Sequence, residues 1–191
     1  YTFDLTTGNN IHSIENPYVS GDGDRDFFAI DVDIDDNYFI VGADAEQADS
    51  GAAYLFDITT GNIVETFLNP NNVGTNTDDE FGWKVYLSDS YILISAKGEE
   101  TASGANSGTV YVYNKSNQAF SHSIVNPNSY NTPNADYFGY SMDTDGDKAI
   151  IGAHGEESSS GASNSGVAYI IDIATGTVLH TLQNPNIHGT A

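Results

Sequence analysis

The sequence predicts an all-β fold built from repeated units of four antiparallel strands. Three stretches share one order of residues: DFFAIDVDIDDNYFIVGAD (26–44), DEFGWKVYLSDSYILISAK (79–97) and DYFGYSMDTDGDKAIIGAH (136–154). Each is followed by a strand pattern around a Tyr and then by a hairpin that ends in Asn-Pro. The Asn of Asn-Pro stands at positions 16, 69, 126 and 184, so the steps are 53, 57 and 58 residues. A period of that length, made only of strand patterns, is typical of a propeller or an all-β array.

The second unit shows the expected elements in order. Residues 81–87 form the first strand, and Ser88-Asp89-Ser90 turns the chain into a second strand over 91–96. A polar loop leads to a third strand over 109–114, and a turn leads to a fourth over 118–125. Asn126-Pro127 ends the unit, because proline donates no hydrogen bond to a ladder. Four antiparallel strands in this order predict a propeller-type blade, and no segment shows the 3.6-residue period of a helix.

The whole chain, 1–191, is expected to form a single repeat domain. Its parts are a half blade over 1–17 and full blades over 27–70, 81–127 and 138–185. Three and a half blades are fewer than the four to eight of a typical closed propeller. We therefore expect a larger propeller or repeat array that continues beyond Ala191, or another subunit that covers the blade ends.

One Phe near the start of each unit is expected to fill the core between neighbouring blades. Small residues at the matching end of the second strand leave room for these rings. The predicted core rings are Phe27, Phe81 and Phe138, and the small residues are Ala43, Ala96 and Ala153.

These residues resemble the FG-GAP repeat, the blade unit of integrin-type β-propellers. Phe81-Gly82 and Phe138-Gly139 match the FG pair, and Gly42-Ala43 and Gly152-Ala153 match the start of GAP. The resemblance is closest to the variant with reduced calcium loops found in bacterial surface and secreted proteins. It implies an extracellular or cell-surface module.

The sequence departs from the FG-GAP pattern in three places. Phe28 stands where we expect the first Gly, Ser95 replaces the Gly of the second GAP, and no unit has its Pro. We therefore expect a slightly distorted inner edge in the first blade.

Charge excludes several classes of partner. The chain has 27 acidic and 5 basic residues, for a formal net charge of −22. Such a surface repels nucleic acid and anionic membranes, and no apolar run reaches the roughly 18 residues of a membrane span. The absence of cysteine excludes disulfides and thiol chemistry. Asn114-Lys115-Ser116 is a glycosylation sequon in pattern only.

The alternating acids of DTDGD, which are Asp143, Asp145 and Asp147, allow two interpretations. They form either a calcium site or a tight turn centred on Asp145-Gly146. Calcium takes six to eight oxygens, usually from a loop that wraps the ion. The second unit has only Ser88-Asp89-Ser90 at this place, which favours the turn.

Two other acidic groups are candidates for a cation site. Asp22, Asp24 and Asp26 lie in a loop with Gly21 and Gly23, at the alternate spacing that a wrapped cation favours, and a solvated acidic loop is the alternative. A further cluster recurs in the loops between the second and third strands. Its members are Glu46 and Asp49, Glu99 and Glu100, and Glu156 and Glu157. We expect a charged rim there, either solubilising or ligand-binding, and Ca²⁺ is the cofactor that the sequence leaves open.

No catalytic motif accompanies these acids. The chain lacks the nucleophile elbow, the zinc-protease helix motif and the phosphate loop, so we do not expect an enzyme. The first hypothesis is an adhesion or interaction module that binds a protein or glycan at the loop rim. The second is a structural subunit of a surface layer or filament that self-associates through blade ends. The third is a propeller-fold polysaccharide lyase or hydrolase.

Overall fold

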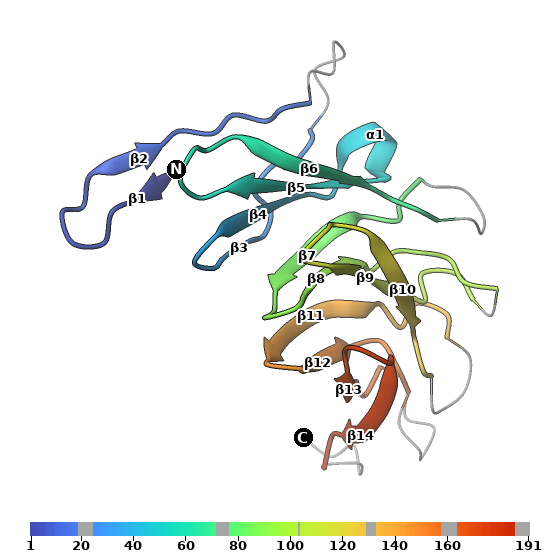
Figure 1. The fold of residues 1–191 in the computed structure, drawn as a ribbon. Helices are drawn as coiled ribbons and strands as arrows, with labels where there is room; N and C mark the ends of the chain where they lie inside the picture. Colours follow the sequence, from blue (N-terminus) through green and yellow to red (C-terminus); the bar gives the residue numbers. More distant parts are fainter. Residues whose placement is uncertain (19–24, 72–76, 103, 129–132, 158–163, 186–191) are drawn as a thin grey trace.

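A computed structural model describes residues 1–18, 25–71, 77–102, 104–128, 133–157 and 164–185. These residues form one two-stranded and three four-stranded antiparallel sheets, which follow one another in an arc (Figure 1). The expected all-β class and blade-type sheets are confirmed, and the described sheets do not close into a ring. The described part also contains α1 (Glu46–Asp49), a single helical turn after β4 that the sequence did not predict.

Each four-stranded sheet keeps the order of the chain. The N-terminal hairpin pairs β1 (Thr2–Phe3) with β2 (Asn10–His12). The first sheet holds β3 (Val32–Ile34), β4 (Tyr38–Ala43), β5 (Ala52–Asp57) and β6 (Ile63–Leu68). The second sheet holds β7 (Phe81–Leu87), β8 (Tyr91–Ala96), β9 (Thr109–Asn114) and β10 (Phe120–Val125). The third sheet holds β11 (Phe138–Asp145), β12 (Lys148–Ala153), β13 (Val167–Asp172) and β14 (Thr177–Gln183).

The core lies between the sheets, because each following sheet lays its first strand on the preceding one. Strand β7 packs on β3, β4 and β5, and β11 packs on β7, β8 and β9. The first interface buries apolar side chains such as Ile40, Leu55 and Phe81, and the second buries Leu93, Val112 and Phe138. Burial of this kind is the main favourable term in folding, so the stack of sheets stabilises itself.

The prediction of a core Phe ring is confirmed in the second and third units, and it is wrong in the first. Phe81 and Phe138 are fully buried, and each meets a Tyr of its own sheet edge-on, with ring centroids 5.6 and 6.0 Å apart. Phe27 is 50% exposed, whereas Phe28 makes the equivalent contact to Tyr54 at 5.9 Å.

The backbone explains this shift by one residue. Ala29 has φ of 71°, and it occupies the place that Gly82 (94°) and Gly139 (89°) hold in the other units. Phe28 is therefore the Phe of the first unit, and it does not replace the Gly. The inner strand of this unit, β3, is only three residues long, in line with the expected distortion.

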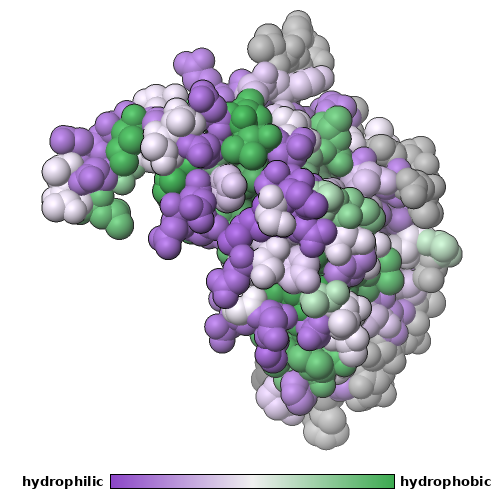
Figure 2. Space-filling model, viewed as in Figure 1, coloured by the Kyte–Doolittle hydropathy of each residue, from purple (hydrophilic) through white to green (hydrophobic). Residues whose placement is uncertain are grey.

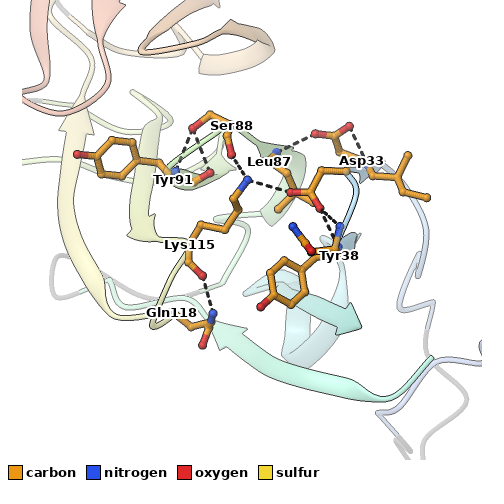
Figure 3. A network of polar contacts seen from close by, with 10 residues as sticks. Asp33, Tyr38, Leu87, Ser88, Tyr91, Lys115 and Gln118 are labelled. Carbon is orange, nitrogen blue, oxygen red and sulfur yellow. Dashed lines mark hydrogen bonds and ion pairs between the residues drawn. The ribbon is translucent and has the colours of Figure 1, made fainter. Parts of the chain in front are cut away.

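Polar side chains join the first sheet to the second on the side opposite to the loops after β4 and β8 (Figure 3). Asp33 Oδ2 accepts a hydrogen bond from the backbone N–H of Leu87 at 2.7 Å. Asp31 Oδ2 accepts one from that of Val85 at 3.0 Å. Lys115 Nζ donates to Asp35 Oδ2 at 2.9 Å and to the carbonyl oxygen of Ser88 at 2.5 Å. These acids occupy donors on the free edge of β7, which would otherwise be open to pairing with another strand.

Within the described ranges, no helix has the length and apolar character that crossing a membrane requires.

Candidate functional site

An Asp–Asn contact recurs at the entry to the first strand of each of the three full units. In the first three Asn-Pro pairs, Asn Nδ2 donates to the carboxylate of the Asp two residues before the next core Phe. The contacts are Asn16 to Asp26 at 3.1 Å, Asn69 to Asp79 at 2.7 Å and Asn126 to Asp136 at 2.8 Å. Asp79 and Asp136 are fully buried. The Asn of Asn-Pro therefore fixes the segment that leads into the next sheet.

A second carboxylate lies buried in each loop after the second strand. Glu46, Glu99 and Glu156 accept hydrogen bonds from the hydroxyl groups of Tyr54, Tyr111 and Tyr169 at 2.5–2.6 Å. All three Glu residues are buried. The expectation that these acids form part of a charged rim is therefore wrong, because the Tyr that packs on the core Phe also draws the Glu inward.

Burial shifts the pKa values of these carboxyl groups upward. It raises the pKa of Asp136 to about 6, partly offset by the hydrogen bond from Asn126. It raises the pKa of Glu99 to about 7, against the hydrogen bond from Tyr111, and the nearby charge of Asp79 adds to the rise. The same cause raises the pKa of Glu46 and of Asp79. Removal from water disfavours the charged form of a carboxyl group. The folded chain is therefore most stable when these groups are protonated.

The carboxylate network has a structural character. Loop backbone surrounds these acids. For example, the Gly98 N–H donates to the carbonyl oxygen of Asp79, and the Gly108 N–H donates to the carbonyl oxygen of Glu99. Asp79, Asp136 and the three Glu residues are buried, whereas a general acid or base needs hydrogen-bond reach to the reacting atom. The accessible chemistry must come from the side chains above this network.

Those side chains line a hollow of about 430 Å³ between the loops of the second and third sheets, which we call the rim pocket. Antiparallel pairing places the start of each first strand beside the end of each second strand, so loops from both sheets meet there. The lining residues are Asp78, Glu80, Lys97, Gly98, Asn106, Tyr137, Tyr140 and His154.

Aromatic rings run along one side of the rim pocket. Trp83 on β7 donates its Nε1–H to the Tyr140 carbonyl oxygen at 2.9 Å, and the two ring centroids lie 5.4 Å apart. The His154 ring lies 4.2 Å from that of Tyr140 and is stacked at 5.3 Å on Tyr137. Tyr140 stays 41% exposed despite these contacts. Four rings from two sheets thus form a continuous surface with polar groups beside it.

The single cation of the rim pocket is already engaged. Lys97 Nζ lies 4.0 Å from the Trp83 ring centroid and forms an ion pair with Glu80. Towards the first sheet, burial and the nearby charge of Glu80 raise the pKa of Asp44 to about 6, while Lys97 lowers it. The rim pocket therefore combines aromatic faces, one compensated acid and the exposed carboxylate of Asp78.

The metal candidates fall in separate places. Asp22 and Asp24 lie outside the described residues, and Asp26 accepts the hydrogen bond from Asn16. Asp143 and Asp145 lie on β11, where Asp143 Oδ1 accepts a hydrogen bond from Thr144 N, and Asp147 pairs with Lys148 at 2.6 Å. Across the described ranges, no group of three or more His, Cys, Asp or Glu side chains is arranged to hold a metal ion. Calcium binding stays a prediction.

The DTDGD stretch forms a β-hairpin, as the turn interpretation expects. Asp145 pairs with Lys148, so the two central residues are Gly146 and Asp147, one position later than expected. Gly146 has φ of 61°, which glycine adopts without steric cost.

Sequence reasoning missed both the buried network and the rim pocket. A signal for the first was present, because each Glu follows the Ala that ends the second strand by three residues. The rim pocket had no local signal, because its lining comes from five separate segments of two units.

Two segments, residues 73–113 and 131–171, match the family model described as FG-GAP repeat. They include β7, β8, β11 and β12, and all but the last residue of β9 and β13. No curated protein matches the chain at a significant level.

Proposed function

Because the chain carries FG-GAP repeats, we propose that it is a non-catalytic extracellular or cell-surface module that binds a protein or glycan partner at the loop rim. The observation that carries this proposal is the rim pocket, with its exposed aromatic and polar side chains between two sheets. Ligand sites are usually concave and combine apolar or aromatic walls with a few polar groups. Function also concentrates on loops held by a rigid scaffold.

Two further features support a binding module. FG-GAP repeats are typical of extracellular or surface proteins, and a net charge of −22 suits a cation-rich medium that screens self-repulsion. The buried carboxylates serve the fold, and of the two acids that line the rim pocket, Glu80 is already paired with Lys97. We therefore favour binding over a lyase or hydrolase activity.

The test is binding of the fluorescently labelled chain to surfaces of the source cells and to their isolated extracellular polymers. We expect saturable binding that Tyr140→Ala abolishes and that Tyr1→Ala, an exposed Tyr→Ala change outside the rim pocket, leaves intact. Equal binding of Tyr140→Ala and the parent chain would contradict a role of the rim pocket. Release of unsaturated or reducing sugars from the polymers would contradict a non-catalytic module.

The uncovered faces of the outer sheets favour a second candidate, a structural subunit that assembles through blade ends. Val32 on β3 is 61% exposed, whereas Val85, at the same place on β7, is buried against the first sheet. Ile150 on the third sheet is 43% exposed, whereas its equivalent Leu93 is buried by β11. The first and third sheets therefore offer the two halves of an interface that occurs twice within the chain.

A second copy of this chain would suit both faces. Figure 2 shows apolar patches on the N-terminal hairpin and the neighbouring first sheet, with a hollow beside them. Residues of both elements, including Phe3, Leu5, Phe28 and Val32, line a hollow of about 600 Å³. On the third sheet, Asp143 occupies the place of Asp33, which accepts a backbone N–H from the next sheet. A second copy could supply that donor.

Light scattering at increasing concentration tests this assembly. We expect head-to-tail oligomers that Val32→Asp or Ile150→Asp breaks into monomers with unchanged circular dichroism. A monomer at all concentrations contradicts self-association.

A further inference from the structure

The side chains that line the rim pocket limit the class of ligand that it can bind. This inference rests on the proposed function, because it concerns the same site. Three classes of ligand have to be compared: anions, cations and neutral polar molecules. The charges of the chain and of the pocket disfavour anions and cations, and the aromatic surface favours neutral polar molecules.

Anionic ligands are disfavoured by the field of the whole chain. With a net charge of −22, the protein repels phosphate, sulfate and uronate groups over distances of about a Debye length. Inside the rim pocket, the ammonium group of Lys97 is already paired with Glu80 and lies over Trp83. It is therefore not available as an anchor for an anion.

A cationic ligand would meet an occupied site for the same reason. A cation prefers the face of Trp and a neighbouring carboxylate, and Lys97 holds both of these positions. The remaining acid, Asp78, is exposed, and an exposed ion pair contributes little to affinity.

A neutral ligand with hydroxyl groups and apolar ring faces fits what remains. Tyr140 keeps an exposed ring beside His154, and aromatic rings combine apolar faces with polar edges. Asp78 can accept hydrogen bonds from hydroxyl groups, and the side chain of Asn106 can both donate and accept. Sugar rings present C–H faces and hydroxyl edges in this combination.

We propose that the rim pocket binds a neutral glycan, with a sugar ring against Tyr140 and with hydroxyl groups on Asp78 and Asn106. The hollow of about 430 Å³ lies within the usual size range of ligand pockets. The site needs both sheets, because Asp78 and Asn106 belong to the second unit and Tyr140 belongs to the third.

The single Trp of the chain provides the assay. Trp83 is hydrogen-bonded to the backbone carbonyl of Tyr140 and lies beside the rim pocket. Its fluorescence should therefore change when a ligand binds. We would titrate the full chain with cello-, malto-, xylo- and mannohexaose up to millimolar concentration. Saturable quenching or enhancement by at least one hexaose, unchanged by added NaCl, is the expected result.

Variants locate the binding. Tyr140→Ala should weaken it about tenfold or more, Tyr140→Phe should retain it because the ring remains, and Tyr1→Ala is the matched control. Asp78→Asn preserves the shape of a residue at φ of 65°, a conformation that Asn tolerates, and should weaken binding by removing an acceptor. This second variant keeps the test valid if Tyr140→Ala unfolds.

The proposal is overturned by no saturable signal with any of the four hexaoses, or by equal affinity of Tyr140→Ala and Asp78→Asn with the parent chain. Salt-sensitive binding of pentalysine without hexaose binding also overturns it, in favour of a cationic ligand. A further outcome is cell-surface binding that depends on Tyr140 and yet is lost when the cells are treated with protease. That result would indicate a protein ligand: it would agree with the proposed interaction module and contradict the glycan.

Discussion

The buried carboxyl group of Asp136 should make the chain more stable in weak acid than at neutral pH. Its pKa is raised from an ordinary value of 3.8 to about 6, because burial disfavours the charged form. The folded chain then binds a proton more tightly than the unfolded chain. Stability from this group is fully present below pH 3.8 and is lost as the pH rises through 6.

The size of the effect follows from the shift. A difference of about 2 pKa units, at about 1.4 kcal/mol each, gives about 3 kcal/mol between pH 4 and pH 7.5. Asp136→Asn cannot titrate, so its stability should equal that of the parent chain near pH 4 and exceed it by up to about 3 kcal/mol at pH 7.5. The Asn side chain can still accept the hydrogen bond from Asn126 through its own oxygen.

Urea unfolding at constant ionic strength, followed by Trp83 fluorescence from pH 4 to 7.5, measures this difference. Asp89→Asn, in the exposed turn after β7, corrects for the loss of one negative charge. Asn126→Ala offers an independent readout, because losing its hydrogen bond should move the midpoint of the pH dependence upward. Parallel curves for Asp136→Asn and the parent chain, after the Asp89→Asn correction, would refute the reasoning.

Three further predictions follow from packing and charge. Phe138→Ala should lower the free energy of unfolding by about 3–5 kcal/mol, whereas Phe27→Ala, at a half-exposed ring, should cost far less; equal losses in urea unfolding would contradict the shift in the first unit. Gly42→Ala should lower the melting temperature more than Gly8→Ala, because its Cβ would collide with the Gly82 carbonyl, whereas Gly8 has open space and only an unfavourable φ; the reverse order would disprove that close approach. NaCl should raise the melting temperature by screening the net charge, and a calcium site at DTDGD would add a shift at matched ionic strength that Asp143→Asn removes; identical curves would exclude that site.

The repeat period and the strand alternation were enough to predict the sheets. In the second unit, the first three strands match their expected bounds of 81–87, 91–96 and 109–114. The fourth begins at Phe120 instead of residue 118, because Gln118 has φ of 58° and closes the turn by donating its N–H to the Asn114 carbonyl. Alternation says little about such turn residues, since their backbone is set by local hydrogen bonds.

Residue type and strand alternation could not identify the core ring of the first unit, because Phe27 and Phe28 are adjacent and chemically equal. A spacing shared by all units would have chosen correctly, since Asp26, Asp79 and Asp136 each precede the core ring by two residues. The burial of Glu99 was hidden for a different reason. A carboxylate in a polar loop reads as solvated, and its partner Tyr111 lies twelve residues away across a loop of variable length.

The distribution of chemistry along the rim explains why we place function there and not in the repeat network. Equivalent rim positions share a left-handed backbone conformation but carry different side chains. The φ angle is 49° at Phe27, 58° at Glu80 and 55° at Tyr137. The residue after the second strand likewise changes from Asp44 to Lys97 to His154. The Asp–Asn and Glu–Tyr contacts beneath do not use these side chains, so the rim residues can differ between units while the repeated network is kept. The rim between the second and third sheets, where these changes bring aromatic rings together, is therefore the part of the chain best suited to recognise a ligand.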